Sequence, residues 1–180
     1  STEGADVLPY AIPDFDFDYS LVDPGVPVGF WRSVGSSHNA FYTESAIDEA
    51  AHTAKQDPFE YRRILLVQKP RFRKVLEKVA ADANWGRGIP KGHGLGIALH
   101  KSSASIVGAV LEVSANASGN LKMHKVWITI DCGKVVNPDT VRAQMEGGFV
   151  FGLSAVLGEE ITLKNGRVEQ SNFHDYTILR

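Results

Sequence analysis

The 180-residue chain is poor in the residues that build several common kinds of functional site. Cys132 is its single cysteine, so no internal disulfide can form, and an iron–sulfur cluster would need ligands from elsewhere. Its six histidines lack both the i, i+4 pairing and the HExxH pattern of zinc sites, so we expect no metal site among them. Nothing near Cys132 indicates a reactive thiol, and we expect a small buried residue there.

The chain also lacks a large excess of charge of one sign and a long apolar run. A formal net charge of -2 provides no basic patch for nucleic acid or for an anionic membrane, and we expect neither as a partner. The most apolar run, residues 149–157, is far shorter than the roughly 20 residues of a membrane-spanning helix. The composition is that of a globular protein, and the length allows one well-filled domain or two small ones.

An unusual helix is predicted to begin at Pro138, where Asn137 can cap it and proline fits the first helical position. Gly147 and Gly148 then lie inside this helix, although each costs about 1 kcal/mol there relative to alanine. They would let another backbone or a flat ligand approach the helix axis. Gln144, one turn earlier on the same face, offers a donor and an acceptor. Tight packing of the helix on a sheet explains the glycines equally well, so both interpretations stay open.

The remaining pattern predicts an α+β fold. Acidic and aromatic residues alternate over residues 14–19, which predicts a half-buried strand; an acidic, aromatic binding strip is the less favoured alternative. Apolar spacing and turn residues predict further helices over 39–55, 57–66 and 70–83, strands over 95–100, 105–114 and 122–131, and a hairpin at 161–168. In the strand over 122–131, we expect the core-facing set to be His124, Val126, Ile128 and Ile130.

The chain divides into a strand and loop segment (1–35), a helical segment (36–85) and a strand–helix–strand segment (95–180). Helices come first, and a mixed or antiparallel sheet with one long packing helix follows. This order favours an α+β domain over a doubly wound sheet.

A turn of small residues follows Trp31, Arg32 and Ser33 and leads into a helix, an arrangement that can present backbone N–H groups to an anion. Taken alone, the segment favours a buried or capping arginine over an anion site. A serine hydrolase is rejected, because the strand–turn–helix G-x-S-x-G elbow is missing. The glycines over residues 86–96 do not follow a strand and open a helix, as a dinucleotide-binding fingerprint requires.

Four segments of different composition occur in a fixed order: WRSVG at 31–35, DPFEYRR at 57–63, DCGKVVNPDTVRAQMEGGFVFGLSA at 131–155 and QSNFHDYTILR at 170–180. Together they resemble the molybdenum hydroxylases of the xanthine oxidase type. More narrowly, they are similar to the large, molybdopterin-binding subunits of the isoquinoline 1-oxidoreductase and aldehyde-oxidising group. The resemblance covers nearly the whole chain and implies part of a molybdopterin-binding domain.

The resemblance implies roles for six residues. Trp31, Arg32 and Ser33 would correspond to the loop that approaches molybdenum, often F-R-G in the family, so Trp and Ser replace Phe and Gly here. Gln144 would correspond to the glutamine that hydrogen-bonds the pterin. The small residues behind it would be Gly147 and Gly148.

No residue of the chain is assigned as catalytic or as a metal ligand. By resemblance, the general-base glutamate is expected in a Gly-x-Gly-Glu segment beyond Arg180, and a first molybdopterin loop before Ser1. Neither Glu112 nor Glu146 matches the motif of that base. We therefore expect a fragment that is inactive alone.

For the full-length protein, the resemblance implies molybdopterin, in its cytosine dinucleotide form, and we expect this fragment alone to lack it. It also implies a small iron–sulfur subunit as partner and a small-molecule substrate, an N-heteroaromatic or an aldehyde, with water as the oxygen source. A periplasmic location rests on family analogy only. The alternatives are a noncatalytic α+β module that binds a partner subunit, and an oxidoreductase domain that uses an organic dinucleotide.

Overall fold

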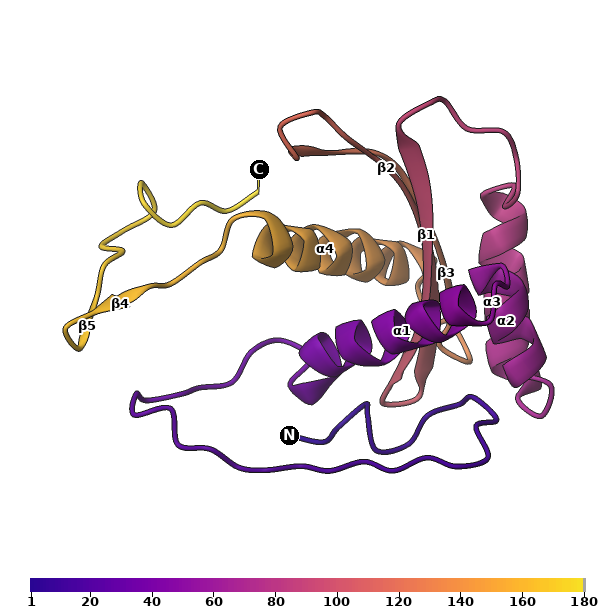
Figure 1. The fold of residues 1–180 in the computed structure, drawn as a ribbon, viewed down its shortest axis with the longest axis horizontal. Helices are drawn as coiled ribbons and strands as arrows, with labels where there is room; N and C mark the ends of the chain where they lie inside the picture. The colour runs from indigo at the N-terminus through magenta and orange to yellow at the C-terminus, as the bar shows by residue number, and fades with distance from the viewer. Residues whose placement is uncertain (180) are drawn as a thin grey trace. The chain divides into compact units, whose positions relative to one another are not determined.

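Helices and an antiparallel sheet make up the chain in a computed structural model that describes residues 1–179. One unit covers residues 1–133, and a second begins at Lys134. The first unit contains α1 (Gly35–Thr53), α2 (Pro58–Leu65), α3 (Pro70–Asp82), β1 (His93–Ser102), β2 (Ser105–Ala115) and β3 (Leu121–Asp131) (Figure 1). The second contains α4 (Pro138–Leu157), β4 (Leu163–Lys164) and β5 (Arg167–Val168). These elements confirm the predicted α+β class.

The sheet of the first unit has the order β1-β2-β3, and both pairings are antiparallel. Helix α3 packs on this sheet, and its buried residues recur at the helical spacing seen in the sequence. The buried core that results contains Tyr10, Ile47, Leu66, Val75, Leu76, Val79, Ala80, Ala83, Ile97, Leu99, Ile106 and Val110.

The predicted core-facing set of β3 is wrong. Directly paired residues of an antiparallel sheet share a face, and β2 residue Val110, on the core face, pairs with Trp127. Trp127 therefore packs against the core, while Val126 and Ile128 lie on the opposite face and are half-buried. Both faces of this strand carry apolar side chains, so alternation alone cannot identify the inner one.

Two further expectations are corrected. Residues 14–19 form no strand, because no other part of residues 1–179 pairs with them, and their aromatic side chains are partly exposed. A strand is stable only against a neighbouring strand. Cys132 is half-exposed rather than buried.

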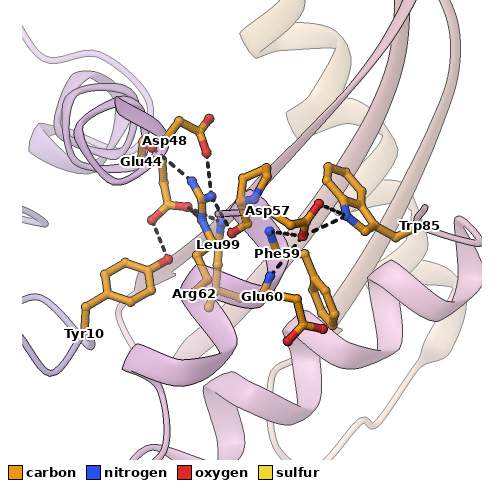
Figure 2. Close-up of polar contacts among 10 residues, drawn as sticks. Tyr10, Glu44, Asp48, Asp57, Phe59, Glu60, Arg62, Trp85 and Leu99 are labelled. Atoms are coloured by element: carbon orange, nitrogen blue, oxygen red, sulfur yellow. Dashed lines mark hydrogen bonds and ion pairs between the residues drawn. The ribbon is translucent and has the colours of Figure 1, made fainter. Parts of the chain in front are cut away.

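A fully buried arginine joins α1 and α2 (Figure 2). On α2, Arg62 places Nε 3.0 Å from the Oε2 atom of Glu44 and Nη1 2.5 Å from the Oδ1 atom of Asp48, both on α1. Its Nη2 atom also donates to the backbone carbonyl of Glu44 at 2.9 Å. Burial tends to lower the pKa of Arg62, but the neighbouring carboxylates outweigh it and raise that pKa, so Arg62 stays charged.

The carboxylate of Glu44 extends this network to two more segments. Its Oε1 atom accepts a hydrogen bond from the hydroxyl of Tyr10 at 2.8 Å, and its Oε2 atom accepts one from the backbone N–H of Leu99 at 2.8 Å. Burial raises the pKa of Glu44, and Arg62 and the Leu99 N–H oppose that rise. Leu99 lies in β1, an edge strand, so the carboxylate also occupies a backbone donor that an edge would otherwise leave unpaired.

Asp57 caps α2, as the sequence predicts. Its Oδ1 atom accepts hydrogen bonds from the backbone N–H groups of Phe59 and Glu60 at 2.9 and 3.0 Å. The same carboxylate accepts the indole N–H of Trp85 at 3.0 Å, which ties the start of α2 to the segment after α3 (Figure 2). One acidic side chain thus fixes both a helix start and a connecting loop.

Gly108 sits where β2 passes closest to α3. A Cβ atom there would lie 3.1 Å from a methyl group of Val75 and 3.1 Å from one of Val79. Both valines are buried and stiff at χ1, so they cannot move aside easily. We predict that Gly108→Ala lowers the free energy of unfolding by about 1 to 3 kcal/mol, measured by guanidinium denaturation.

Gly96 provides the matched control, because a Cβ on this β1 residue would meet no atom within 4 Å. Gly96→Ala should leave the free energy of unfolding unchanged or raise it slightly. Equal effects of the two substitutions would contradict the close packing of α3 on β2.

Candidate functional site

The segment from Trp31 to Gly35 is a strained turn that leads into α1. The backbone N–H of Val34 donates to the carbonyl of Trp31, and that of Ser36 donates to the carbonyl of Ser33, both at 3.0 Å. Ser33 has φ 72° and Val34 has φ 49°, both in the left-handed region. Such conformations cost about 1 to 3 kcal/mol each for residues other than glycine and cluster at ligand-binding and catalytic sites.

The turn is held against the first residues of the chain. A Cβ atom on Gly35 would lie 2.7 Å from the Ser1 hydroxyl oxygen and 2.9 Å from the carbonyl oxygen of Glu3, so this close approach requires glycine. Asn39, buried on α1, donates from its side-chain amide to the carbonyls of Ser1 and Glu3 at 3.0 and 2.9 Å. The turn therefore has a fixed support on one side.

Helix α4 carries the second group of candidate residues. Asn137 caps it as predicted, with its Oδ1 atom accepting from the backbone N–H of Asp139 at 2.9 Å and of Thr140 at 3.3 Å. Near its other end, the buried Ser154 accepts a hydrogen bond from the backbone N–H of Leu179 at 2.8 Å. Both ends of α4 are thus fixed within the second unit.

The middle of α4 is exposed at Gln144 and Gly147. Gly148 is half-buried. Within the second unit (residues 134–179), and apart from the backbone of α4 and the two neighbouring residues, no heavy atom lies within 4 Å of the place that a Cβ on Gly147 would take. Packing within the second unit therefore does not account for this glycine. Free space beside an amide fits a planar group that needs close backbone approach.

Sequence reasoning missed a cluster at one end of the sheet. The Nδ1 atom of His93 lies 2.7 Å from Glu112, and Arg87 lies 2.5 Å from the other oxygen of that carboxylate. The hydrogen bond from His93, followed by the charge of Arg87, lowers the pKa of Glu112. The ring of His124 stacks on that of His93 at 4.1 Å, beside a bulge between Glu112 and Val113. Glu112 is thus held as a carboxylate.

Among residues 1–179, His, Cys, Asp and Glu side chains form no group of three or more that could hold a metal ion. Within the same range, every helix is too short or too polar to cross a membrane.

A sequence model of one protein family, described as the molybdopterin cofactor-binding domain, matches residues 31–180. The chain belongs to this family. The match includes both the strained turn at Trp31 and the open face of α4. No solved structure shows a significant match to this chain.

Individual relatives are consistent with this assignment. The chain is 36% identical over 178 residues to the beta chain of isoquinoline 1-oxidoreductase from Brevundimonas diminuta, a match that covers 97% of this chain and 23% of that protein. It is 28% identical over 192 residues to a nicotinate dehydrogenase subunit of Pseudomonas putida, covering 94% of this chain and 16% of that protein. These matches and the family model confirm the resemblance to the molybdenum hydroxylases.

A third relative carries a different cofactor in its name. The chain is 32% identical over 176 residues to membrane-bound aldehyde dehydrogenase [pyrroloquinoline-quinone] of Gluconacetobacter polyoxogenes, covering 84% of this chain and 22% of that protein. This name supports an oxidoreductase relationship and does not support molybdopterin. The chain thus spans less than a quarter of each of these three relatives.

The strain in the turn can be measured. We predict that Val34→Gly raises the free energy of unfolding by about 1 kcal/mol, because glycine adopts a positive φ without the steric cost of a β-branched residue. The gain is smaller than the strain because glycine also loses more backbone entropy on folding. Guanidinium denaturation followed by tryptophan fluorescence measures the change.

Val28 is the control, because it is exposed and its φ lies outside the left-handed region. Val28→Gly should give no gain in stability. If Val34→Gly changes the free energy of unfolding no more favourably than Val28→Gly does, the turn is not strained.

Proposed function

We propose that this chain is part of the molybdenum-cofactor-binding subunit of an oxidoreductase that oxidises N-heteroaromatics or aldehydes with water as the oxygen source. The observation that carries the proposal is the open face of α4 at Gly147, which lies inside the family match and beside the amide of Gln144. The names of the relatives, for isoquinoline, nicotinate and aldehyde, support this substrate class.

Helix α4 supplies shape and hydrogen bonding in this proposal. The Gln144 amide can donate to and accept from the edge of a pterin at once, which a charged or hydroxyl side chain cannot do in the same geometry. In the proposal, Gly147 leaves room for the flat ring beside the helix backbone, and the half-buried Gly148 lies behind it. When bound, the cofactor supplies the metal centre at which the substrate is oxidised.

The turn at Trp31, Arg32 and Ser33 has a positioning role in the proposal. In the proposal, the left-handed residues that follow Arg32, and the close contact of Gly35 with the first residues of the chain, restrict the backbone that carries Arg32. A fixed guanidinium stabilises negative charge without reorganising, which is how preorganised sites lower a barrier. The ring of Trp31, partly exposed, can exclude water from the same region.

The rest of the catalytic apparatus is assigned outside residues 1–180. The proposal includes molybdopterin in its cytosine dinucleotide form, a general-base glutamate elsewhere in the parent subunit and a small iron–sulfur subunit that passes electrons onward. Glu112 is not that base in the proposal, because Arg87 and His93 already hold its carboxylate. The isolated chain is proposed to be inactive and to hold no cofactor.

The test uses the intact parent protein. We predict that Gln144→Ala lowers cofactor affinity about tenfold, because one or two hydrogen bonds to the pterin, together worth about 1.4 kcal/mol, are lost. Molybdenum content by elemental analysis, under limiting cofactor, and turnover measure the effect. Circular dichroism checks that the variant keeps its fold.

Gln68, exposed in the connection between α2 and α3, is the control position. Gln68→Ala should leave metal content and turnover unchanged. If Gln144→Ala behaves like this control, the proposed binding of the cofactor by α4 is wrong, and the noncatalytic subunit-interaction module becomes the better account.

A further inference from the structure

The first six residues of the chain contact both His100 on β1 and the strained turn that opens α1. We define residues 1–6 as the N-terminal latch. The carbonyl of Thr2 accepts hydrogen bonds from the backbone N–H groups of Ala5 and Asp6 at 3.0 and 3.2 Å, and Ala5 is only 3% exposed. The latch is therefore a packed turn of the first unit.

Gly4 is the residue of the latch that packs against His100. A Cβ atom on Gly4 would lie 3.0 Å from the Cε1 atom and 3.1 Å from the Nε2 atom of His100, and 3.3 Å from the Cα atom of Ser36. Gly4 also has φ 89°, in the left-handed region. Only glycine fits this place between β1 and the first turn of α1. Its neighbour Glu3 places a carbonyl against Gly35, so one packed segment contacts both the histidine and the strained turn.

The Nε2 atom of His100 is buried and has no hydrogen-bond partner among residues 1–179. Because atoms of this chain cover it, parts of the parent protein outside the chain cannot reach it while the latch is closed. The neutral ring can keep its proton on Nδ1 and leave Nε2 as an unprotonated acceptor, but the charged ring carries an N–H on both nitrogens. A buried N–H without an acceptor costs more than a hydrogen bond gains.

Charged groups of both signs surround the ring. Burial lowers the pKa of His100, and the charge of Glu3 on the latch opposes this only in part. A cavity beside the ring is lined by two carboxylates and two ammonium groups, which come from the latch, α1, the residue before α3, and β1 itself. They are Asp6, Glu44, Lys69 and Lys101. Their signs balance, so burial decides the charge of the ring.

We propose that the N-terminal latch is a pH-sensitive device, which stays packed on the turn at Trp31 to Gly35 while His100 is neutral and releases that turn when His100 gains a proton. The proton comes from solvent, and the charged ring needs water at Nε2, which can enter only if Gly4 moves away. Because Glu3 adjoins Gly4, its carbonyl then leaves both Gly35 and the amide of Asn39.

The direction of the pH dependence follows from the burial of the ring. The closed latch binds a proton at His100 less readily than the open latch does, so falling pH favours the open form. The closed form has its full advantage above the ordinary histidine pKa of 6.5 and loses it as the pH falls below that value. In the parent enzyme this matters through Arg32, a consequence that rests on the proposed function.

Hydrogen exchange of the intact parent protein tests the device. We expect amide protection in peptides covering residues 1–10 and 31–40 to fall together, at least about threefold, between about pH 7 and about pH 5. Protection is taken relative to an unstructured peptide at the same pH, read by mass spectrometry. The slow exchange of the histidine Cε1–H, followed against pH, should give a pKa for His100 below 6.5.

Three variants make the test specific. His100→Gln cannot gain a proton and should abolish the loss of protection in both peptides. His52→Gln removes an exposed histidine of α1 and should keep the loss, which makes it the matched control. Glu3→Gln should also keep the loss, because the carboxylate only opposes the effect of burial on His100.

Four results would overturn the proposal. A His100 pKa at or above 6.5 would mean that the closed latch does not disfavour the proton. Loss of protection that persists in His100→Gln, or that vanishes in Glu3→Gln, would assign the pH dependence to another group. Opening of residues 1–10 without residues 31–40 would mean that the latch does not hold the turn. These readouts do not measure molybdenum content, and the wild-type titration stands even if a variant fails to fold. This proposal and the proposed function therefore fail independently.

Discussion

The ion pair between Arg62 and Glu44 is the constraint on which the first unit depends. A guanidinium without water must find acceptors for its donors, and a buried carboxylate must find donors for its oxygens. Here the guanidinium of Arg62 donates to the carboxylate of Glu44. That carboxylate also accepts hydrogen bonds from the hydroxyl of Tyr10 and from the backbone N–H of Leu99 (Figure 2). One pair therefore fixes the N-terminal segment, α1, α2 and the edge strand β1 relative to one another.

This constraint also bears on the candidate site in the first unit. The strained turn at Trp31 to Gly35 opens α1, the helix that carries Glu44 and Asn39. Because α1 is fixed by the buried pair and holds the first residues of the chain through Asn39, the turn at the start of α1 has a rigid support. A rigid support is what allows left-handed conformations at Ser33 and Val34 to persist.

Both groups of candidate residues contain a local feature that costs stability. In the first unit, residues other than glycine adopt a positive φ, and in the second, Gly147 occupies a helix interior where no neighbour within that unit requires it. Functional sites are the places where such local rules are broken. The family match covers both the strained turn and the glycine in α4. We therefore assign cofactor binding to these residues rather than to the polar cluster around Glu112.

Local sequence patterns predicted the elements well. The apolar spacing of α3, the caps at Asp57 and Asn137 and the turn at Asn165–Gly166 each involve residues a few positions apart, and each was confirmed. Gln144 and Gly147 were selected from the same kind of local signal, the cost of glycine within a helix. That they bind a cofactor stays a prediction.

What the sequence did not predict depends on contacts between distant residues. Arg62 and Glu44 are 18 positions apart, and Glu44 and Leu99 are 55 apart, so no short pattern reveals them. The inner face of β3 was misassigned because both faces are apolar. The strand over residues 14–19 was predicted from a correct alternation, but a strand also needs a neighbour, and residues 1–179 provide none. The positive φ of Val34 has no signal in its residue type.

The most direct measurement compares the unfolding free energies of Arg62→Met and Arg63→Met. The two arginines are adjacent on α2, but Arg63 makes only an exposed pair with Glu60. Loss of Arg62 leaves a buried carboxylate uncompensated, so its variant should lose about 3 to 5 kcal/mol, against less than about 1 kcal/mol for Arg63→Met. Similar small losses in both variants would contradict the claim that the buried pair holds the first unit together.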